Sequence, residues 1–351
     1  MTLAETLKEI RPLDRSIESA AQERLDSLTK PQRSLGKLEE LARRIAVIQG
    51  RVPPRTGRKV LFVFAADHGI TQEGVSAYPR EVTAQMTTNF LKGGAAINVL
   101  SRHHGVETEV VDVGVDHDFT GSSGLRHYKI RRGTANFAHG PAMTHEEAAR
   151  SVELGIQLAG EVARENVFVL SAGDMGIGNT SSAAAILCAI TGAAAADVVG
   201  RGTGIDDATL ARKIAAIKRG LETNTPDVHD ALDVLAKIGG LEIGAMTGMI
   251  LGAASLRIPM VLDGFVAGAA ALLAQRFSPH VRDILIASHL SAEKGHRQML
   301  EQLELTPILD LSLRLGEGTG ACILMGLIEA AVKIMGEMAT FKSAGVEERF
   351  A

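Results

Sequence analysis

A continuous apolar segment, KVLFVFA at 59–65, constrains the fold of this chain more than any other feature. A strand that lacks alternating polar residues must be covered on both faces, as the strands of parallel sheets are. Further strand candidates follow at 108–115, 167–170, 259–262 and 282–287, separated by segments with helical spacing and by turn residues. This alternation predicts an α/β fold with a doubly wound parallel sheet.

The first 50 residues favour helices rather than strands. Apolar residues recur at helical spacing from Ile17 to Leu25 and from Leu38 to Ile45. The segment KPQRSLG at 30–36 predicts a turn between these two helices, and Ser34 could cap the second one.

The stretch 116–144 shows no regular pattern and is predicted to be irregular. At its end, Thr144 and Glu147 have the spacing of a capping box, in which each residue bonds the backbone of the other. A helix is therefore predicted to begin there and to reach Arg164.

Composition excludes several classes of partner. Only 3% of the residues are aromatic, none is Trp, and the formal net charge is -4 without a dense Lys/Arg run, so nucleic-acid binding is not expected. The N-terminal segment lacks the apolar core of a signal peptide, and apolar runs such as 183–196 are too short to span a membrane. Cys188 and Cys322 lie in apolar helical patterns, which predicts buried thiols in a reducing compartment. We therefore expect a soluble cytoplasmic protein.

Polar residues and glycines follow almost every predicted strand. The segments are Asp67-His68-Gly69, Gly173 to Thr180, Asp263-Gly264, Ser288-His289 and the glycine-rich loop around Glu317. The carboxyl ends of parallel strands lie along one edge of the sheet, where α/β enzymes bind their ligands. Together these segments predict a ligand crevice at that edge.

Glu317 lies between glycines in LSLRLGEGTGA at 311–321, just before an apolar helix predicted from 321 to 331. Flanking glycines allow a tight turn and the close approach of a ligand, and a single acid at such a junction suits a general base. The alternative is a solvated turn or an ordinary helix start, where acidic residues are favoured. This segment alone favours the alternative, so the assignment depends on the rest of the chain.

A candidate anion site follows the strand at 167–170. The sequence GDMGIGNTSS at 173–182 leads from this strand through glycines into an Ala-rich helix, whose N-terminus can bind a phosphate. The third glycine of a dinucleotide-binding fingerprint is missing, and no P-loop sequence exists in the chain. A second glycine loop, GRGTG at 200–204, precedes a helix that carries Lys213. We interpret Asp206-Asp207 between them as an acidic helix start.

His289, Glu293 and His296 would share one face of a helix, which is the spacing of a possible zinc site. Lys294 and Arg297 beside them oppose a cation, so ion pairing on that helix face is expected instead. We predict no metal site and no other cofactor.

The chain contains, in this order, KPQRSLGKLE, ADHGI with EGVSAYPREVTAQM, NFLKGGAAINVLSR, GDMGIGNTSSAAA, GRGTGIDD, GGLEIGAMTGM, VLDGF, SHLSAEKGH and LRLGEGTGA. Together these segments resemble the nicotinate-nucleotide–dimethylbenzimidazole phosphoribosyltransferase family of cobalamin nucleotide-loop assembly, and the match runs from Lys30 to Phe341. The resemblance implies a Rossmann-like α/β catalytic domain at 56–321. It also implies a smaller helical domain built from 1–55 and 322–351, and a homodimer.

The activity that the resemblance implies is transfer of ribose 5-phosphate from nicotinate mononucleotide to 5,6-dimethylbenzimidazole, giving α-ribazole 5′-phosphate and nicotinate. The glutamate of the family's GEGTGA motif is the catalytic base, and here it is Glu317. It would take a proton from one ring nitrogen while the other attacks C1′, with inversion from β to α. An apolar pocket should raise the pKa of Glu317 for this task. Asp174, where many members have Glu, would be a second acid near the ribose.

The same resemblance implies two groups of binding residues. The phosphate and ribose would be held by Gly176, Gly178, Asn179, Thr180, Gly202, Thr203, Gly204 and Lys213. The aromatic base would be held by Ser76, Tyr78, Pro79, Gln85 and Leu315, with Tyr78 stacking on the ring and Gln85 bonding its edge. Arg33 departs from the family, which tends to have glycine at that position of the KPQRSLG turn.

Two other functions stay open at this point. One is a different nucleotide-phosphate transferase that uses phosphoribosyl diphosphate, a chemistry that normally needs Mg²⁺. The other is a non-catalytic sensor that binds azoles or mononucleotides on the same fold.

Overall fold

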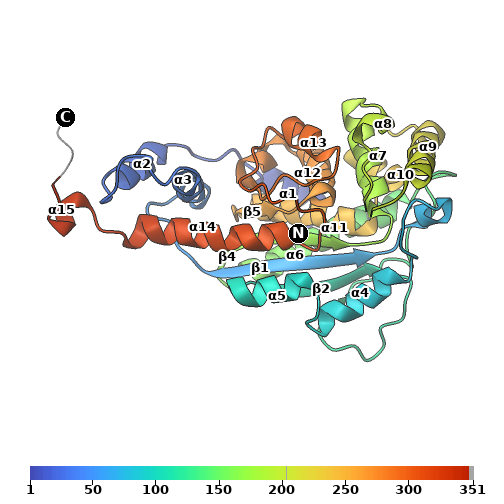
Figure 1. The fold of residues 1–351 in the computed structure, drawn as a ribbon, viewed down its shortest axis with the longest axis horizontal. Coiled ribbons are helices and arrows are strands. Elements are labelled where there is room, and N and C mark those ends of the chain that lie inside the picture. The colour runs from blue at the N-terminus through green and yellow to red at the C-terminus, as the bar shows by residue number, and fades with distance from the viewer. Residues whose placement is uncertain (203, 348–351) are drawn as a thin grey trace.

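Parallel strands form a six-stranded sheet at the centre of the molecule (Figure 1). The computed structural model describes residues 1–202 and 204–347. In chain order the strands are β1 (Arg58–Ala66), β2 (Glu107–Gly114), β3 (Leu125–His127), β4 (Val167–Met175), β5 (Met260–Leu262) and β6 (Leu285–Ala287). Across the sheet they lie in the order β3-β2-β1-β4-β5-β6, so the direction of winding reverses between β1 and β4, as in a Rossmann-like sheet. The predicted fold class is confirmed.

Helices cover both faces of this sheet (Figure 1). On one face α11 (Leu241–Ser255) packs on β1, β2 and β4, and α6 (His145–Ala163) packs against α11. On the other face α14 (Thr319–Glu337) contacts β4 and β5, α4 (Val82–Leu91) contacts β1 and β2, and α5 (Ala96–His104) contacts β2. The remaining α-helices are α1 (Leu3–Glu9), α2 (Glu18–Asp26), α3 (Lys37–Gln49), α7 (Asn179–Thr191), α8 (Ala195–Val198), α9 (Asp207–Asn224), α10 (Ala231–Ile238), α12 (Phe265–Phe277), α13 (His296–Gln302) and α15 (Phe341–Ala344).

Successive residues of β1 belong to two different cores. Phe62 and Phe64 pack in the core that contains α6 and α11, whereas Leu61 and Val63 pack in the core that contains α3 and α14. All four side chains are fully buried, and burial of each contributes roughly 1.5–3 kcal/mol. The uninterrupted apolar sequence at 59–65 therefore follows from burial of both faces of the strand, as predicted.

β4 continues to Met175, beyond its predicted end at Leu170. It pairs along its length with the equally long β1, so its backbone groups find partners as far as Met175. Asp174 consequently lies within the strand, and the glycine loop begins only at Gly176. The longer strand carries Asp174 to the carboxyl edge of the sheet.

Two further strands and one helix start differ from the prediction. β6 begins at Leu285, because 279–284 forms a 3-10 helix. β3 lies within the stretch predicted to be irregular, and its three residues are too few to show a pattern. α3 begins at Lys37 with Gly36 at its N-cap, so Ser34 does not cap it.

The predicted starts of two other helices, α6 and α9, are confirmed. Thr144 and Glu147 bond each other's backbone at the start of α6, which confirms the capping box. Asp206 accepts a hydrogen bond from the backbone of Thr209 at the start of α9 (2.8 Å), which confirms the acidic helix start.

Segments from near both ends of the chain come together at one side of the molecule, where α2, α3 and the last turns of α14 lie together (Figure 1). Arg24 of α2 donates hydrogen bonds to the carbonyl oxygens of Met335 and Met338, both at 3.0 Å. α1 does not belong to this group, since it packs against α11 and α6. A separate domain made from 1–55 and 322–351 stays a prediction.

α14 is the one helix of the described chain whose length and composition would allow it to cross a membrane. More than half of its apolar stretch is buried inside the protein, where Cys322, Met325 and Ile328 belong to the second core. α14 is therefore packed as a core helix. Cys322 and Cys188 are free, buried thiols, as predicted.

Candidate active site

A cavity of about 690 Å³ opens at the carboxyl edge of the sheet, beyond β4, β5 and β6. Its walls come from five parts of the chain and two single residues: 75–86, 174–180, 264–266, 289–293 and 312–317, with Gly202 and Lys213. Four of the strand-end segments predicted to meet in a crevice thus contribute to one cavity. The fifth, at 67–69, lies beside the cavity, where the His68 ring lies against Gly176.

Glu317 enters this cavity from a tight turn before α14. Gly316, Glu317 and Gly318 all have left-handed backbone, with φ of 84°, 61° and 84°. Such a conformation is unfavourable for glutamate and costs on the order of 1–2 kcal/mol, so the surrounding structure must impose it. The turn lies against Gly173 of β4, where a Cβ atom would come within 2.5 Å of the Glu317 carbonyl oxygen. Asp263 holds it from the other side by accepting a hydrogen bond from the Gly318 N–H (3.1 Å).

The Glu317 carboxylate has the electrostatic properties of a base that works near neutral pH. It is 5% exposed, and its Oε2 has no hydrogen-bond partner among the described residues. Burial, and to a smaller extent the charge of Asp263, raise its pKa to about 7, although a backbone hydrogen bond from Ile97 opposes the shift. A carboxylate with such a pKa is ionised in part at pH 7 and binds a proton more strongly than an exposed one.

Asp174 lies beside the same turn, but its carboxyl group suits a different chemical role. Its Oδ2 accepts a hydrogen bond from the side-chain amide of Asn179 (2.7 Å). Burial and the neighbouring Asp263 raise the pKa of Asp174 to about 8. The Asp174 carboxyl is therefore mostly protonated at neutral pH and can donate a hydrogen bond, while Glu317 accepts protons.

The predicted anion loop connects β4 to α7. Gly178, with φ of 98°, is the N-cap of α7, and the Ile177 N–H is held by the hydroxyl of Thr83 (3.1 Å). At the cavity wall Lys213 donates a hydrogen bond to the hydroxyl of Thr180 (2.8 Å). Burial lowers the pKa of Lys213 to about 8, although the charge of Glu293 opposes this shift. A helix N-terminus and an ammonium group thus converge where a phosphate would be held.

A buried pair supports this loop from below. His68 Nε2 lies 2.6 Å from Glu242 Oε1, and its Nδ1 lies 3.2 Å from the hydroxyl of Ser182. The Ser182 hydroxyl also donates a hydrogen bond to the Gly239 carbonyl oxygen (3.2 Å), which links this pair to the segment before α11. A Cβ atom at Gly176 would lie 3.2 Å from the His68 ring, so the first glycine of the loop rests directly on it.

The cavity brings together most of the site residues predicted from the sequence. Those that line it are Ser76, Tyr78, Asp174, Gly176, Gly178, Asn179, Thr180, Gly202, Lys213, Leu315 and Glu317. Pro79 and Gly204 are exposed and do not line it, and Thr203 lies outside the described residues. Gln85 lies on another side of α4, where it lines a smaller hollow of about 300 Å³ with Asp67 and Arg80.

Several cavity residues are absent from the sequence-based set. Val75, Val82 and Met86 form an apolar wall next to Tyr78. Val82 and Met86 have the i, i+4 spacing of one helix face, a signal present in the sequence, but the direction in which α4 turns that face depends on packing. Ser291, Glu293 and Arg314 also line the cavity, and Arg314 donates a hydrogen bond to the Gly202 carbonyl oxygen (3.1 Å).

The helix face predicted for residues 289–296 is wrong. α13 begins only at His296, whose Nδ1 accepts a hydrogen bond from the Ser291 N–H (2.8 Å). Burial lowers the pKa of His296 to about 3 and also lowers that of His289, so both rings are neutral at physiological pH. No group of three or more His, Cys, Asp and Glu side chains within the described residues is arranged to hold a metal ion.

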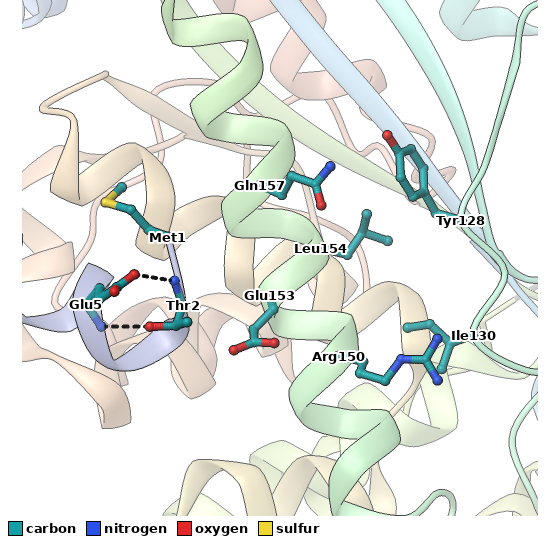
Figure 2. Close-up of a pocket in the computed structure, with 9 residues that line it drawn as sticks. All are labelled: Met1, Thr2, Glu5, Tyr128, Ile130, Arg150, Glu153, Leu154 and Gln157. Carbon is teal, nitrogen blue, oxygen red and sulfur yellow. Dashed lines mark hydrogen bonds between the residues drawn. The ribbon is translucent and has the colours of Figure 1, made fainter.

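Figure 2 shows another hollow, of about 640 Å³, between α1, α6 and the segment after β3. Thr2 and Glu5 bond each other there in the capping box of α1, and Arg150 and Glu153 project from α6. None of its lining residues borders the strand-end cavity. Its charged side chains are exposed, and hydrogen bonds from the Thr2 backbone and hydroxyl lower the pKa of Glu5, which is the opposite of the shift at Glu317.

Residues 10–346 match the family described as Phosphoribosyltransferase. The chain is 56% identical over 346 residues to the nicotinate-nucleotide–dimethylbenzimidazole phosphoribosyltransferase of Geobacter sulfurreducens, covering 99% of this chain and 98% of that protein. It is 52% identical over 347 residues to the protein of the same name from Chloroflexus aggregans, with 99% and 98% covered. The crystal structure of CobT from Thermus thermophilus is similar with a TM-score of 0.91 at 50% identity, covering 95% of this chain and 99% of that one. With full-length similarity of this degree, the chain belongs to the nicotinate-nucleotide–dimethylbenzimidazole phosphoribosyltransferase family.

Proposed function

We propose that this protein transfers ribose 5-phosphate from nicotinate mononucleotide to 5,6-dimethylbenzimidazole and releases nicotinate and α-ribazole 5′-phosphate. The observation that carries the proposal is the position of Glu317, a buried carboxylate with a pKa of about 7 in the same cavity as Lys213 and the glycine loop at 176–178. A base and an anion site in one cavity suit the attack of an azole on a phosphorylated ribose. The names of the relatives support these two substrates.

In the proposed reaction one ring nitrogen of dimethylbenzimidazole attacks C1′ of the ribose. The bond from C1′ to the pyridinium nitrogen breaks, and its electron pair stays on that nitrogen, so nicotinate leaves as a neutral pyridine ring. Glu317 takes the proton from the other ring nitrogen of the acceptor. Attack from the face opposite the leaving group inverts C1′ from β to α.

The leaving group needs little help, because the pyridinium is already cationic. Most of the acceleration must then come from orientation of the two substrates and from removal of the azole proton. Protonated Asp174, adjacent to the Glu317 turn, would donate a hydrogen bond to a ribose oxygen. Its shorter side chain, compared with the Glu of many relatives, still reaches Asn179.

The acceptor would lie against the apolar wall of Val75, Val82 and Met86. Tyr78 and Leu315 complete this side of the cavity but are 54% and 57% exposed, which leaves a large apolar surface at the rim. Exposed apolar surface of this kind is stabilised when a ligand or a partner covers it. The proposal includes a cytoplasmic homodimer that uses no metal and no other cofactor.

A direct test is to incubate the protein with nicotinate mononucleotide and dimethylbenzimidazole and to identify the products by mass. We expect equal amounts of nicotinate and α-ribazole 5′-phosphate, in excess chelator as well as without it. Release of nicotinate without the ribazole product would contradict transfer, and a requirement for phosphoribosyl diphosphate and Mg²⁺ would favour the other transferase. Binding of both ligands without turnover would favour the sensor.

The base is tested by Glu317→Gln. This variant should fold and bind both substrates, but its kcat should fall by roughly 10²–10⁴, the usual contribution of a general base. Near-normal turnover would contradict the assignment of Glu317.

A further inference from the structure

Asp263 at the end of β5 is bonded to the turn that carries Glu317, although the two residues lie far apart in the sequence. Its Oδ2 accepts a hydrogen bond from the Gly318 N–H and its Oδ1 one from the Ala321 N–H, both at 3.1 Å. These donors belong to the start of α14, whose first N–H groups have no partner within the helix. Asp263 is 1% exposed, so its carboxylate rather than solvent satisfies them.

Asp263 is fixed in turn by the strand beside it. The hydroxyl of Ser288 donates a hydrogen bond to the Asp263 carbonyl oxygen (2.8 Å) and lies 2.9 Å from His289 Nδ1. Because that hydroxyl proton is already used, His289 Nδ1 must carry a proton and donate it to Ser288. A continuous series of hydrogen bonds therefore leads from His289 through Ser288 and Asp263 to the turn of Glu317.

We propose that Asp263 is a positioning residue for the transfer reaction, whose carboxylate holds the turn at 316–318 so that the Glu317 carboxylate faces the acceptor. The proposal rests on the proposed function, in which Glu317 is the base. An ordinary helix cap would stabilise the protein in the same way but would not alter the acidity of Glu317.

Asp263 affects the ionisation of Glu317 as well as the shape of the turn at 316–318. Its negative charge raises the pKa of Glu317, in the same direction as burial, which is the larger cause, and against the Ile97 hydrogen bond. Burial, opposed by backbone hydrogen bonds, raises the pKa of Asp263 itself to about 6, so it is ionised when Glu317 titrates at about 7. The titratable groups that act on this part of the site are Asp174 on β4, Glu242 on α11, which raises the pKa of Asp174, His289 after β6 and Cys322 on α14. Asp174 and His289 are neutral at pH 7, and Asp263 is the negative charge that raises the pKa of Glu317.

The test is Asp263→Asn, which keeps the size of the side chain and one acceptor but removes the charge and the second acceptor. We expect kcat to fall roughly 10- to 100-fold, KM for both substrates to stay within about threefold, and the acid limb of the kcat–pH profile to move to lower pH. Asp263→Glu keeps the charge, so its kcat should fall while its acid limb stays in place. Asp230→Asn is the matched control, because Asp230 also caps a helix, α10, by accepting from the Leu232 N–H (2.9 Å). It should leave kcat and the profile unchanged.

The proposal is overturned if Asp263→Asn keeps kcat within twofold of the parent, or loses kcat while the acid limb stays in place. If that variant does not fold, Ser288→Ala decides, since it removes the hydrogen bonds of the Ser288 hydroxyl to the Asp263 backbone and to His289 but leaves the Asp263 carboxylate in place. A lower kcat with unchanged KM then supports positioning, and an unchanged kcat contradicts it. Glu317→Gln is assayed in parallel. If Glu317→Gln is inactive and Asp263→Asn is fully active, only the proposed role of Asp263 is refuted. If Glu317→Gln is active, the proposal that Glu317 is the base is refuted.

Discussion

Gly173 of β4 lies directly behind Glu317, so that a Cβ atom on Gly173 would come within 2.5 Å of the Glu317 carbonyl oxygen and closer still to its carbonyl carbon. Both partners in this contact are backbone atoms, which cannot move aside as a flexible side chain can. The sheet and the turn that carries Glu317 are therefore in contact without any side chain between them. This contact fixes how far Glu317 extends into the cavity.

Gly173→Ala should consequently displace the turn and reduce both stability and turnover. Overpacking of this kind typically costs about 1–3 kcal/mol, and a displacement of the base by a fraction of an ångström should lower kcat at least tenfold. Denaturant unfolding and steady-state kinetics measure the two effects. Gly336→Ala in α14 is the control, because no atom lies within 4 Å of its added Cβ and alanine favours a helix. A Gly173→Ala enzyme with unchanged kcat would show that the turn does not depend on this contact.

The pKa of Glu317, about 7, predicts the pH dependence of the reaction. The base must be ionised to accept a proton, so kcat at saturating substrates should fall with decreasing pH below about 7, approaching tenfold per pH unit. Release of nicotinate between pH 5 and 9 measures this limb. A second acceptor with less basic ring nitrogens shows whether the enzyme or the acceptor causes this limb. A limb caused by Glu317 stays at the same pH when the acceptor is changed. A limb near pH 4.5 would mean that the pKa of Glu317 is not raised in the complex.

The pKa of Lys213, lowered by burial to about 8, predicts an alkaline limb for nucleotide binding. Loss of the ammonium charge above that pH should reduce kcat/KM for nicotinate mononucleotide, while Lys213→Arg, which stays charged, should abolish or move the limb. Lys213→Ala should raise KM for the mononucleotide roughly 10- to 100-fold, the usual value of a charge-assisted hydrogen bond, with a small effect on KM for dimethylbenzimidazole. An alkaline limb that persists in Lys213→Arg would exclude Lys213 as its source.

Asp174→Asn should stabilise the protein, because the native state raises the pKa of Asp174 from 3.8 to about 8. Between these values the unfolded chain is ionised and the native carboxyl holds its proton, so stability falls as pH rises from about 4 to 8. Asparagine removes this slope and can still accept the bond from Asn179. We expect a Tm higher by about 2 °C or more at pH 8, with a smaller gain at pH 5. Asp310→Asn, at an exposed position, is the control and should show no such trend.

Arg33→Gly should also stabilise the protein, through the backbone alone. Arg33 has φ of 61°, a left-handed conformation that glycine adopts without a steric cost, and its exposed side chain forms no ion pair within the described residues. The gain should be up to about 1 kcal/mol, because the greater freedom of glycine in the unfolded chain offsets part of the relief. Urea unfolding measures it. Gln32→Gly in the same turn lacks the left-handed backbone and should destabilise; equal effects of both changes would argue against relief of strain at Arg33.

The sequence predicts those parts of the fold and site that depend on local pattern. The apolar run at 59–65 identifies the central strand because both of its faces are buried. The glycines around Glu317 and after β4 identify the two loops of the cavity because their backbone conformations are uncommon for other residues. The roles proposed for Glu317 and Asp174 follow from resemblance to relatives and not from spacing.

Other features depend on contacts between distant segments, which local pattern does not contain. Gln85 and Met86 are neighbours in the chain, yet Met86 faces the cavity and Gln85 faces away, because packing on β1 sets the rotation of α4. Asp263 reaches the Glu317 turn only through the order of strands in the sheet. His296 looks like part of a continued helix face, but its bond to the Ser291 backbone closes a loop instead.

The left-handed turn at 316–318 also limits how this enzyme can change over generations of mutation. Any residue other than glycine at 316 or 318 destabilises the protein because the backbone there is left-handed, whatever its effect on the reaction. At 318 the added Cβ atom would also collide with Leu61. The apolar wall built by α4 carries no such restriction, since Val82 and Met86 have ordinary helical backbone. Substitutions that alter which aromatic ring is accepted should therefore accumulate on α4, while the three residues that present the carboxylate remain nearly invariant under drift.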